Sequence, residues 1–181
     1  MYSFEIMLST LQSFFALAVL ALVFGTVLET TIFLAGFVPL RLIAGGYHAK
    51  NHFRCFLILM FVYSSLLMTL SYLPLEYMVA VIITSCLVSG VLVFLFAPSE
   101  DNNKPITSEE TTRFRKKSRI AIACNSVVLV VITVFVTDKK YALSLAFGII
   151  TVGLSLLANR IKRRYQVGKN KTVSGEEWIF Q

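Results

Sequence analysis

Long apolar stretches without a single charge alternate along this chain with short segments that carry most of its Lys and Arg residues. Four such stretches cover residues 55–73, 78–97, 120–136 and 141–158. As helices of about 17 to 20 residues, each matches a hydrocarbon core of roughly 30 Å. A lone segment in lipid must satisfy its own backbone hydrogen bonds, so each is predicted to be a transmembrane helix. The pattern excludes a soluble domain with one core and a β-barrel porin, whose strands alternate apolar and polar residues.

The composition agrees with this interpretation. Of the 181 residues, 56% are apolar and 15% are charged, whereas soluble domains carry about 25% charged residues. The net charge of +7 raises the question of nucleic acid, but the basic residues gather at the ends of the apolar stretches, with six between Lys104 and Arg119 and six between Arg160 and Lys171. The positive-inside rule accounts for that placement. No ladder of aromatic and basic residues is present for bases to stack on, so no nucleic-acid partner is expected.

The same charges predict an orientation. Segments rich in Lys and Arg alternate with poor ones, and the rich ones are expected to face the cytoplasm. They comprise the segment 41–55, a cytoplasmic loop at 98–119 and a cytoplasmic tail at 159–181. Pro74 and the run 137–140 mark tight outer turns. The chain is therefore expected to be a single multi-pass membrane domain over residues 1–181.

The N-terminal apolar run, residues 6–40, is too long for one span. A single helix would measure about 52 Å, which exceeds the membrane even when tilted. We expect a break near residues 25–31, which gives an apolar hairpin or re-entrant pair and an all-α bundle of about six segments. A single span flanked by an interfacial helix is the alternative. Glu29, the one carboxylate well inside the run, is either a functional group or part of an outer turn. No basic region precedes the run, so a cleaved signal peptide is not expected.

The segment 41–55, just before a predicted span, gathers reactive side chains: one thiol, two imidazoles and two guanidiniums. A thiol becomes a useful nucleophile when a base takes its proton or a positive environment favours the thiolate. Cys55 has His52 and Arg54 near it in sequence and is expected at a helix N-terminus, whose partial positive charge has the same effect. Cys86 and Cys124 fall inside apolar stretches and are expected to be inert.

Spacing alone leaves the base open. His48 and Cys55 lie seven residues apart, which is about 10.5 Å along a continuous helix, and a base must approach to about 2.6–3.2 Å. The pair Gly45–Gly46 would let a loop fold His48 back, whereas His52 could reach the thiol on a regular turn. Headgroup anchoring is the alternative function for these side chains. A metal site of His48, His52 and Cys55 lacks an evident fourth ligand, so no metal is expected.

A set of residues in this region resembles the accessory gene regulator B (AgrB) family of membrane cysteine peptidases. The set consists of Arg41, Gly45-Gly46-Tyr47-His48-Ala49 and Cys55, followed by Ala97-Pro98 and Lys104-Pro105-Ile106. The resemblance implies a bacterial cell-membrane endopeptidase without a cofactor. Its substrate would be a propeptide of the AgrD type, trimmed at its C-terminal side and closed into a thiolactone or lactone quorum-sensing peptide.

The resemblance also implies roles for individual residues. Cys55 falls on the nucleophile and His48 on the general base, while Arg41 and Gly46 fall on positions that the family needs for activity, with a supporting or oxyanion-binding role. One departure concerns the loop after residue 97: some members carry three lysines before its proline, and this chain has Asn102-Asn103-Lys104. Only Lys104 therefore carries over as a substrate-binding residue.

The basic run 113–119 has two interpretations. It is either a topology determinant in contact with lipid headgroups or a dock for an acidic propeptide tail, formed by Arg115, Lys116 and Lys117 together with Lys104. A non-enzymatic membrane transporter or assembly protein is the rival function, but the four clear spans lack the paired broken helices of transporters. A homodimer is compatible with the sequence, although no strong stripe of small residues predicts one.

Overall fold

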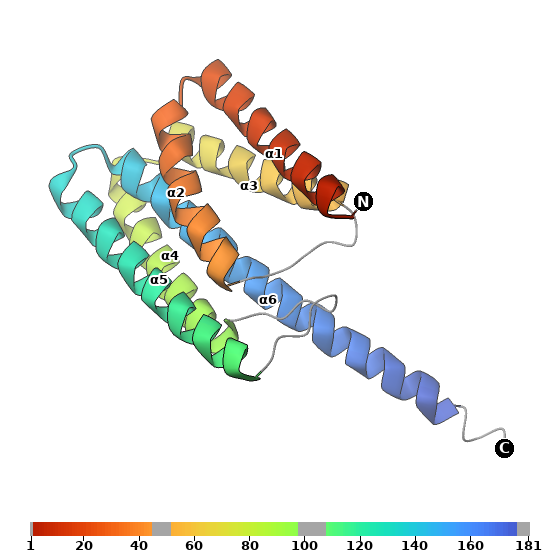
Figure 1. Ribbon diagram of the computed structural model, residues 1–181. Coiled ribbons are helices and arrows are strands. Elements are labelled where there is room, and N and C mark those ends of the chain that lie inside the picture. Colours follow the sequence, from red (N-terminus) through yellow and green to blue (C-terminus); the bar gives the residue numbers. More distant parts are fainter. Residues whose placement is uncertain (1, 45–51, 98–107, 177–181) are drawn as a thin grey trace.

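The structure is a computed structural model that describes residues 2–44, 52–97 and 108–176, and every regular element in these ranges is a helix. The six helices form one bundle (Figure 1): α1 Tyr2–Phe24, α2 Val27–Ala44, α3 His52–Tyr72, α4 Leu75–Phe96, α5 Ser108–Phe135 and α6 Lys139–Glu176. This confirms the prediction of an all-α bundle with about six segments.

The N-terminal apolar run divides at Gly25, as the expected hairpin requires. Gly25 has a φ of 67°, a left-handed conformation that costs glycine least. Its N–H donates to the Leu22 carbonyl at 3.4 Å, and the next N–H, of Thr26, donates to the Ala21 carbonyl at 2.9 Å. This pair of bonds is the Schellman ending of a helix. Helix α2 starts directly afterwards, with Glu29 in its first turn, so that carboxylate lies at the turn.

The two other short connections also form tight turns. Pro74, in an extended conformation, directly precedes α4. Between α5 and α6, the Asp138 carboxylate accepts a hydrogen bond from the Lys140 N–H at 3.0 Å, as an N-cap does. The Lys139 ammonium donates to the Thr133 carbonyl at 2.6 Å and satisfies the end of α5. The predicted turns at Pro74 and 137–140 are therefore confirmed.

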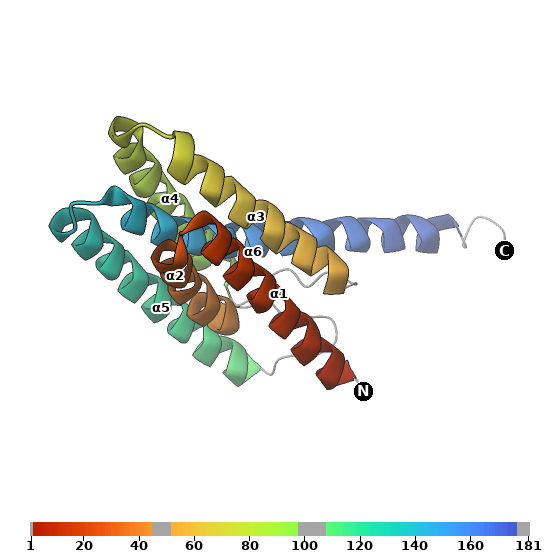
Figure 2. The ribbon, with the colours of Figure 1, turned by 90° about the horizontal axis from the view of Figure 1, so that it is seen from above.

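Because the helices run alternately up and down, these three turns lie at one end of the bundle (Figure 1). The last residues of α2 and α4 and the first residues of α3 and α5 belong to the other end. Helix α6 leaves the bundle at that second end and extends well beyond it (Figure 2). The connections 45–51 and 98–107, which hold the predicted site residues Gly46, His48 and Lys104, therefore join helix ends on one side of the bundle.

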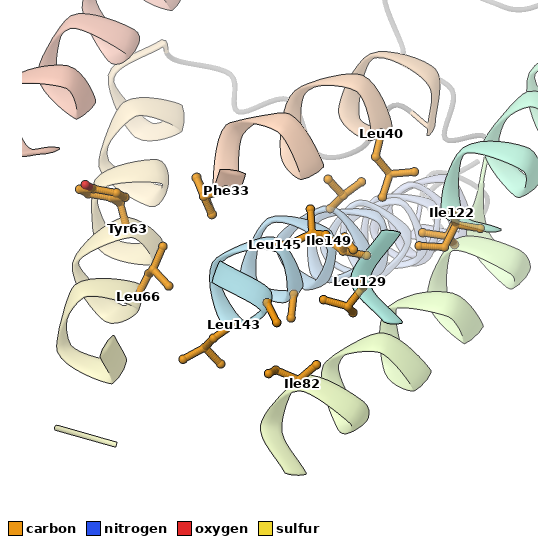
Figure 3. Close-up of a cluster of buried hydrophobic side chains, with 14 of the residues drawn as sticks. Phe33, Leu40, Tyr63, Leu66, Ile82, Ile122, Leu129, Leu143, Leu145 and Ile149 are labelled. Atoms are coloured by element: carbon orange, nitrogen blue, oxygen red, sulfur yellow. The ribbon is translucent and has the colours of Figure 1, made fainter. Parts of the chain in front are cut away.

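Helix α6 is the centre of the packing. It contacts α2 and α4 more extensively than any other helices contact each other, and 56% of its apolar window is buried, against at most 28% for the other long apolar helices. The core around it is mainly aliphatic and aromatic (Figure 3); its fully buried members include Phe33, Leu40, Leu145, Ile149 and Leu156.

Glycines allow α6 to approach its neighbours closely. A Cβ at Gly148 would lie 2.5 Å from the Phe33 carbonyl oxygen of α2, and one at Gly36 would lie 2.7 Å from Leu145 Cδ1. On the other side, a Cβ at Gly153 would lie 3.2 Å from Ser89 Cα of α4. Small residues at such crossings are how membrane helices gain packing contacts.

Four described helices are long and apolar enough to cross a membrane: Val27–Ala44, Leu75–Phe96, Thr112–Phe135 and Lys139–Lys162. Three of them overlap predicted spans, and the fourth is α2 of the N-terminal hairpin. The predicted span 55–73 corresponds to α3, whose described apolar part is Phe56–Tyr72. Helices α5 and α6 also continue through polar sequence that hydropathy does not mark, into the expected loop 98–119 and the expected tail 159–181.

Candidate active site

Arg41, in the last turn of α2, is anchored to the central helix. Its Nη1 donates a hydrogen bond to Ser155 Oγ of α6 at 2.7 Å, and the Ser155 hydroxyl in turn donates to the Val152 carbonyl at 2.8 Å. A cation in the last helical turn also interacts favourably with the partial negative charge there. Arg41 is half-buried between the two helices rather than extended into solvent.

A second contact holds the same end of α2 to α5. The buried Ser118 hydroxyl lies 3.4 Å from the Ile43 carbonyl oxygen and 2.8 Å from the Phe114 carbonyl oxygen of its own helix. Ala44, the last residue of α2, is fully buried. The segment that contains Gly46 and His48 thus follows a helix end that is fixed on two sides.

Cys55 lies in the first turn of α3, which begins at His52. This confirms the expected helix N-terminus, where backbone N–H groups carry a partial positive charge. The side chains of His52 and Cys55 lie outside the described part of the chain, as do Gly46, His48 and Lys104 altogether. The distance between the predicted nucleophile and either predicted base therefore stays a prediction.

The predicted docking residues Arg115, Lys116 and Lys117 are exposed near the start of α5, at the same end of the bundle. Arg119, one turn after Arg115, has a different environment: its guanidinium carbon lies 3.9 Å from the centre of the Phe94 ring of α4. This cation–π contact joins the last turn of α4 to α5, and the sequence pattern gave no sign of it.

The remaining cysteines lie away from this end. Cys86 is half-buried in the middle of α4, with its Sγ 3.6 Å from Ser126 Oγ of α5, and Cys124 is exposed on α5. Among the described residues, no group of three or more His, Cys, Asp or Glu side chains is arranged to hold a metal. Sequence reasoning missed Ser155 and Ser118, because a serine inside an apolar span carries no signal of its partner.

Comparison with known proteins decides the family. The model of the accessory gene regulator B (AgrB) family matches residues 1–156, which includes both segments that carry the motif residues. The chain belongs to the AgrB family. This confirms the resemblance drawn from Arg41, the Gly-Gly-Tyr-His-Ala string and Cys55.

Three known proteins are similar to this chain over most of its length. Protein FsrB of Enterococcus faecalis is 28% identical over 158 residues, which are 86% of this chain and 62% of FsrB. A putative AgrB-like protein of Clostridium acetobutylicum is 32% identical over 83% of the chain and 74% of the relative. A putative AgrB-like protein 2 of Clostridium perfringens is 28% identical over 82% and 75%. The chain thus spans less than two thirds of the length of FsrB. No solved structure matches the chain.

Proposed function

We propose that this chain is a membrane cysteine endopeptidase that matures a quorum-sensing peptide from a propeptide of the AgrD type. Membership of the AgrB family over residues 1–156 carries the proposal. The start of α3 at His52 supports it, because the first turn of a helix is where a cysteine is most readily activated. Cys55 is the proposed nucleophile, and His48 is the proposed base.

The proposed chemistry begins with proton transfer from the Cys55 thiol to His48. The thiolate attacks a propeptide carbonyl, a C–S bond forms, the peptide C–N bond breaks, and His48 returns the proton to the departing amine. The propeptide then remains on Cys55 as a thioester. An internal thiol or hydroxyl of the propeptide attacks that carbonyl, closes the ring and releases Cys55, while its proton passes back through His48 to the enzyme's thiolate.

Ring closure competes with hydrolysis, so the site has to keep water scarce and the internal nucleophile close. A site at the boundary of a membrane bundle suits both needs. On the charge-based orientation, the segment 41–55 faces the cytoplasm of a bacterial cell, where a newly made propeptide is available. Gly46 is proposed to give the segment its turn or to supply a backbone donor for the oxyanion.

Processing by the purified chain in liposomes tests the assignment. A synthetic AgrD-type propeptide with an internal Cys or Ser is added, and its products are followed by mass. Cys55→Ala and His48→Ala are expected to abolish cleavage, and the wild type should form a propeptide adduct that hydroxylamine releases. Full cleavage by Cys55→Ala would refute the peptidase assignment.

Two matched variants control for the loss of a thiol. Cys86→Ala and Cys124→Ala remove the other two cysteines of the chain, from the middle of α4 and α5. Both should process the propeptide at the wild-type rate. If either of them, and not Cys55→Ala, abolished the adduct, the nucleophile would be misassigned.

The exposed basic residues of α5 are proposed to bind the acidic end of the propeptide, together with Lys104. Replacing Arg115, Lys116 and Lys117 with Glu is expected to raise KM several-fold, more at low salt than at high salt, because exposed charge attraction is screened. Accessibility of termini to protease in liposomes reports the orientation in parallel. Unchanged processing with an unchanged orientation would contradict a binding role for these three residues.

A further inference from the structure

The hydrogen bond between Arg41 and Ser155 joins the site to the most buried helix of the bundle. Nη1 of Arg41 lies 2.7 Å from Ser155 Oγ. The serine hydrogen points to the Val152 carbonyl, which leaves the oxygen lone pairs for the guanidinium. A hydrogen bond with one charged partner is stronger and more directional than a neutral one. Ser155 is therefore set up by its own helix as an acceptor for Arg41.

The side chains that α6 presents to the bundle change from mainly apolar to polar near Ser155. Through most of the bundle they are mainly apolar: Leu145, Ile149 and Val152 are fully or almost fully buried, and the buried Ser144 hydroxyl donates to a carbonyl of its own helix. The helix then presents Ser155 and, one turn later, Asn159, which is only 9% exposed. Helix packing alone does not require a hydroxyl that accepts a hydrogen bond from another helix, as Ser155 does, and such a polar group inside a membrane bundle is a candidate for a function.

The end of α2 is consequently held between two helices. Arg41 ties it to α6, and Ser118 contacts the Ile43 carbonyl from α5. The part of the segment 41–55 that holds Gly46 and the proposed base His48 follows directly after Ala44. Catalytic groups must be held within about 0.5 Å of the productive geometry, and a misplacement of about 1 Å from a distant change can reduce the rate about 100-fold.

We infer that Ser155 is a positioning residue of the peptidase site and acts by holding Arg41 against α6. The inference rests on the proposed function and assigns Arg41 a role through the scaffold rather than as an oxyanion donor. In this role Ser155 acts through Arg41 and not by contact with the nucleophile or the propeptide. Its contribution is to keep the end of α2 at one fixed distance from the core.

Kinetics of variants in the liposome assay test this inference. Ser155→Ala is expected to lower kcat about ten-fold or more and to leave KM within about two-fold, because misplacement of reacting groups affects the chemical step. Ser155→Thr keeps the hydroxyl and should restore most of the rate. Arg41→Ala combined with Ser155→Ala should be no slower than Arg41→Ala alone, because both changes break one contact.

Ser144→Ala is the matched control. Ser144 is fully buried on the same helix, and its hydroxyl donates to the Lys140 carbonyl within α6 at 2.9 Å. It should keep the wild-type kcat. Thermal unfolding of each variant in detergent separates a loss of stability from a loss of rate per folded molecule.

Two results would overturn the inference: a wild-type kcat for Ser155→Ala, whatever its melting temperature, or fully multiplicative effects of the Arg41 and Ser155 substitutions. The last would mean that Arg41 acts on the reacting atoms independently of α6. Neither result bears on the proposed function, which is refuted separately if Cys55→Ala still processes the propeptide.

Discussion

Replacing Gly148 with alanine would place a methyl group at the crossing of α2 and α6. The new Cβ would lie 2.5 Å from the Phe33 carbonyl oxygen and 3.1 Å from the Phe37 nitrogen. Both atoms belong to the backbone of α2, so no side-chain rotation relieves the clash. The two helices must separate by about 0.9 Å before the shorter distance reaches an ordinary 3.4 Å contact.

The cost follows from the side chains that such a separation pulls apart. Leu145 and Ile149 of α6 are almost fully buried beside this crossing. A buried side chain of this size makes roughly 40–60 contacts of about 0.1–0.2 kcal/mol, and a gap of about 0.5–1 Å forfeits a quarter to a half of each. If about half of these contacts cross the interface, the two side chains together lose roughly 1–6 kcal/mol. The middle of this range, about 3 kcal/mol, is at the upper end of measured overpacking costs.

Gly90→Ala provides the matched control. Gly90 lies in α4, and a Cβ there would meet nothing within 4 Å. Alanine gains about 1 kcal/mol of helix propensity over glycine at both sites, so the difference between the two variants isolates the steric effect. In detergent micelles, Gly148→Ala should melt about 5–10 °C below Gly90→Ala by circular dichroism. Equal melting temperatures would refute the close approach of α2 and α6.

Two further predictions concern contacts between other helices. Tyr63→Phe removes the hydroxyl that lies 2.6 Å from Thr30 Oγ1 in the core and should lower the unfolding free energy by about 0.5–1.5 kcal/mol. Tyr72→Phe, at an 80% exposed position, should leave the unfolding free energy unchanged. Equal effects of the two substitutions would contradict a buried hydrogen bond at Tyr63. Arg119→Ala removes the stack on Phe94 and should lower the unfolding free energy by about 0.5–1 kcal/mol at this exposed position. Chemical unfolding measures this difference. A stability equal to that of the wild type would show that the stack contributes nothing.

Much of the fold was predictable because lipid restricts the backbone so severely. An apolar stretch of spanning length has to be a helix. A glycine, a proline or an Asp-Lys pair between two such stretches therefore predicts a turn. The starts and ends of α5 and α6 were less predictable. Hydropathy marks only the apolar part of a helix, whereas Glu, Lys and Arg continue a helix into water without any apolar signal.

The site divides in the same way. The position of Cys55 at a helix start was predictable because it precedes a span, but the preference for His48 over His52 depended on the family resemblance, because spacing allowed both. The hydrogen bond between Arg41 and Ser155 could not be predicted from the sequence. Ser155 lies 114 residues away on α6, and its selection depends on how two helices are rotated against each other, which no local pattern records.

Helix α6 is the sixth helix in chain order and also the one against which α2 and α4 pack most extensively. During synthesis the earlier helices enter the membrane before it. Until α6 is inserted, α2 and α4 therefore lack their main partner, and Arg41 lacks its serine. Assembly of the bundle is consequently coupled to the insertion of α6, and the end of α2 is fixed only after the five preceding helices have been made.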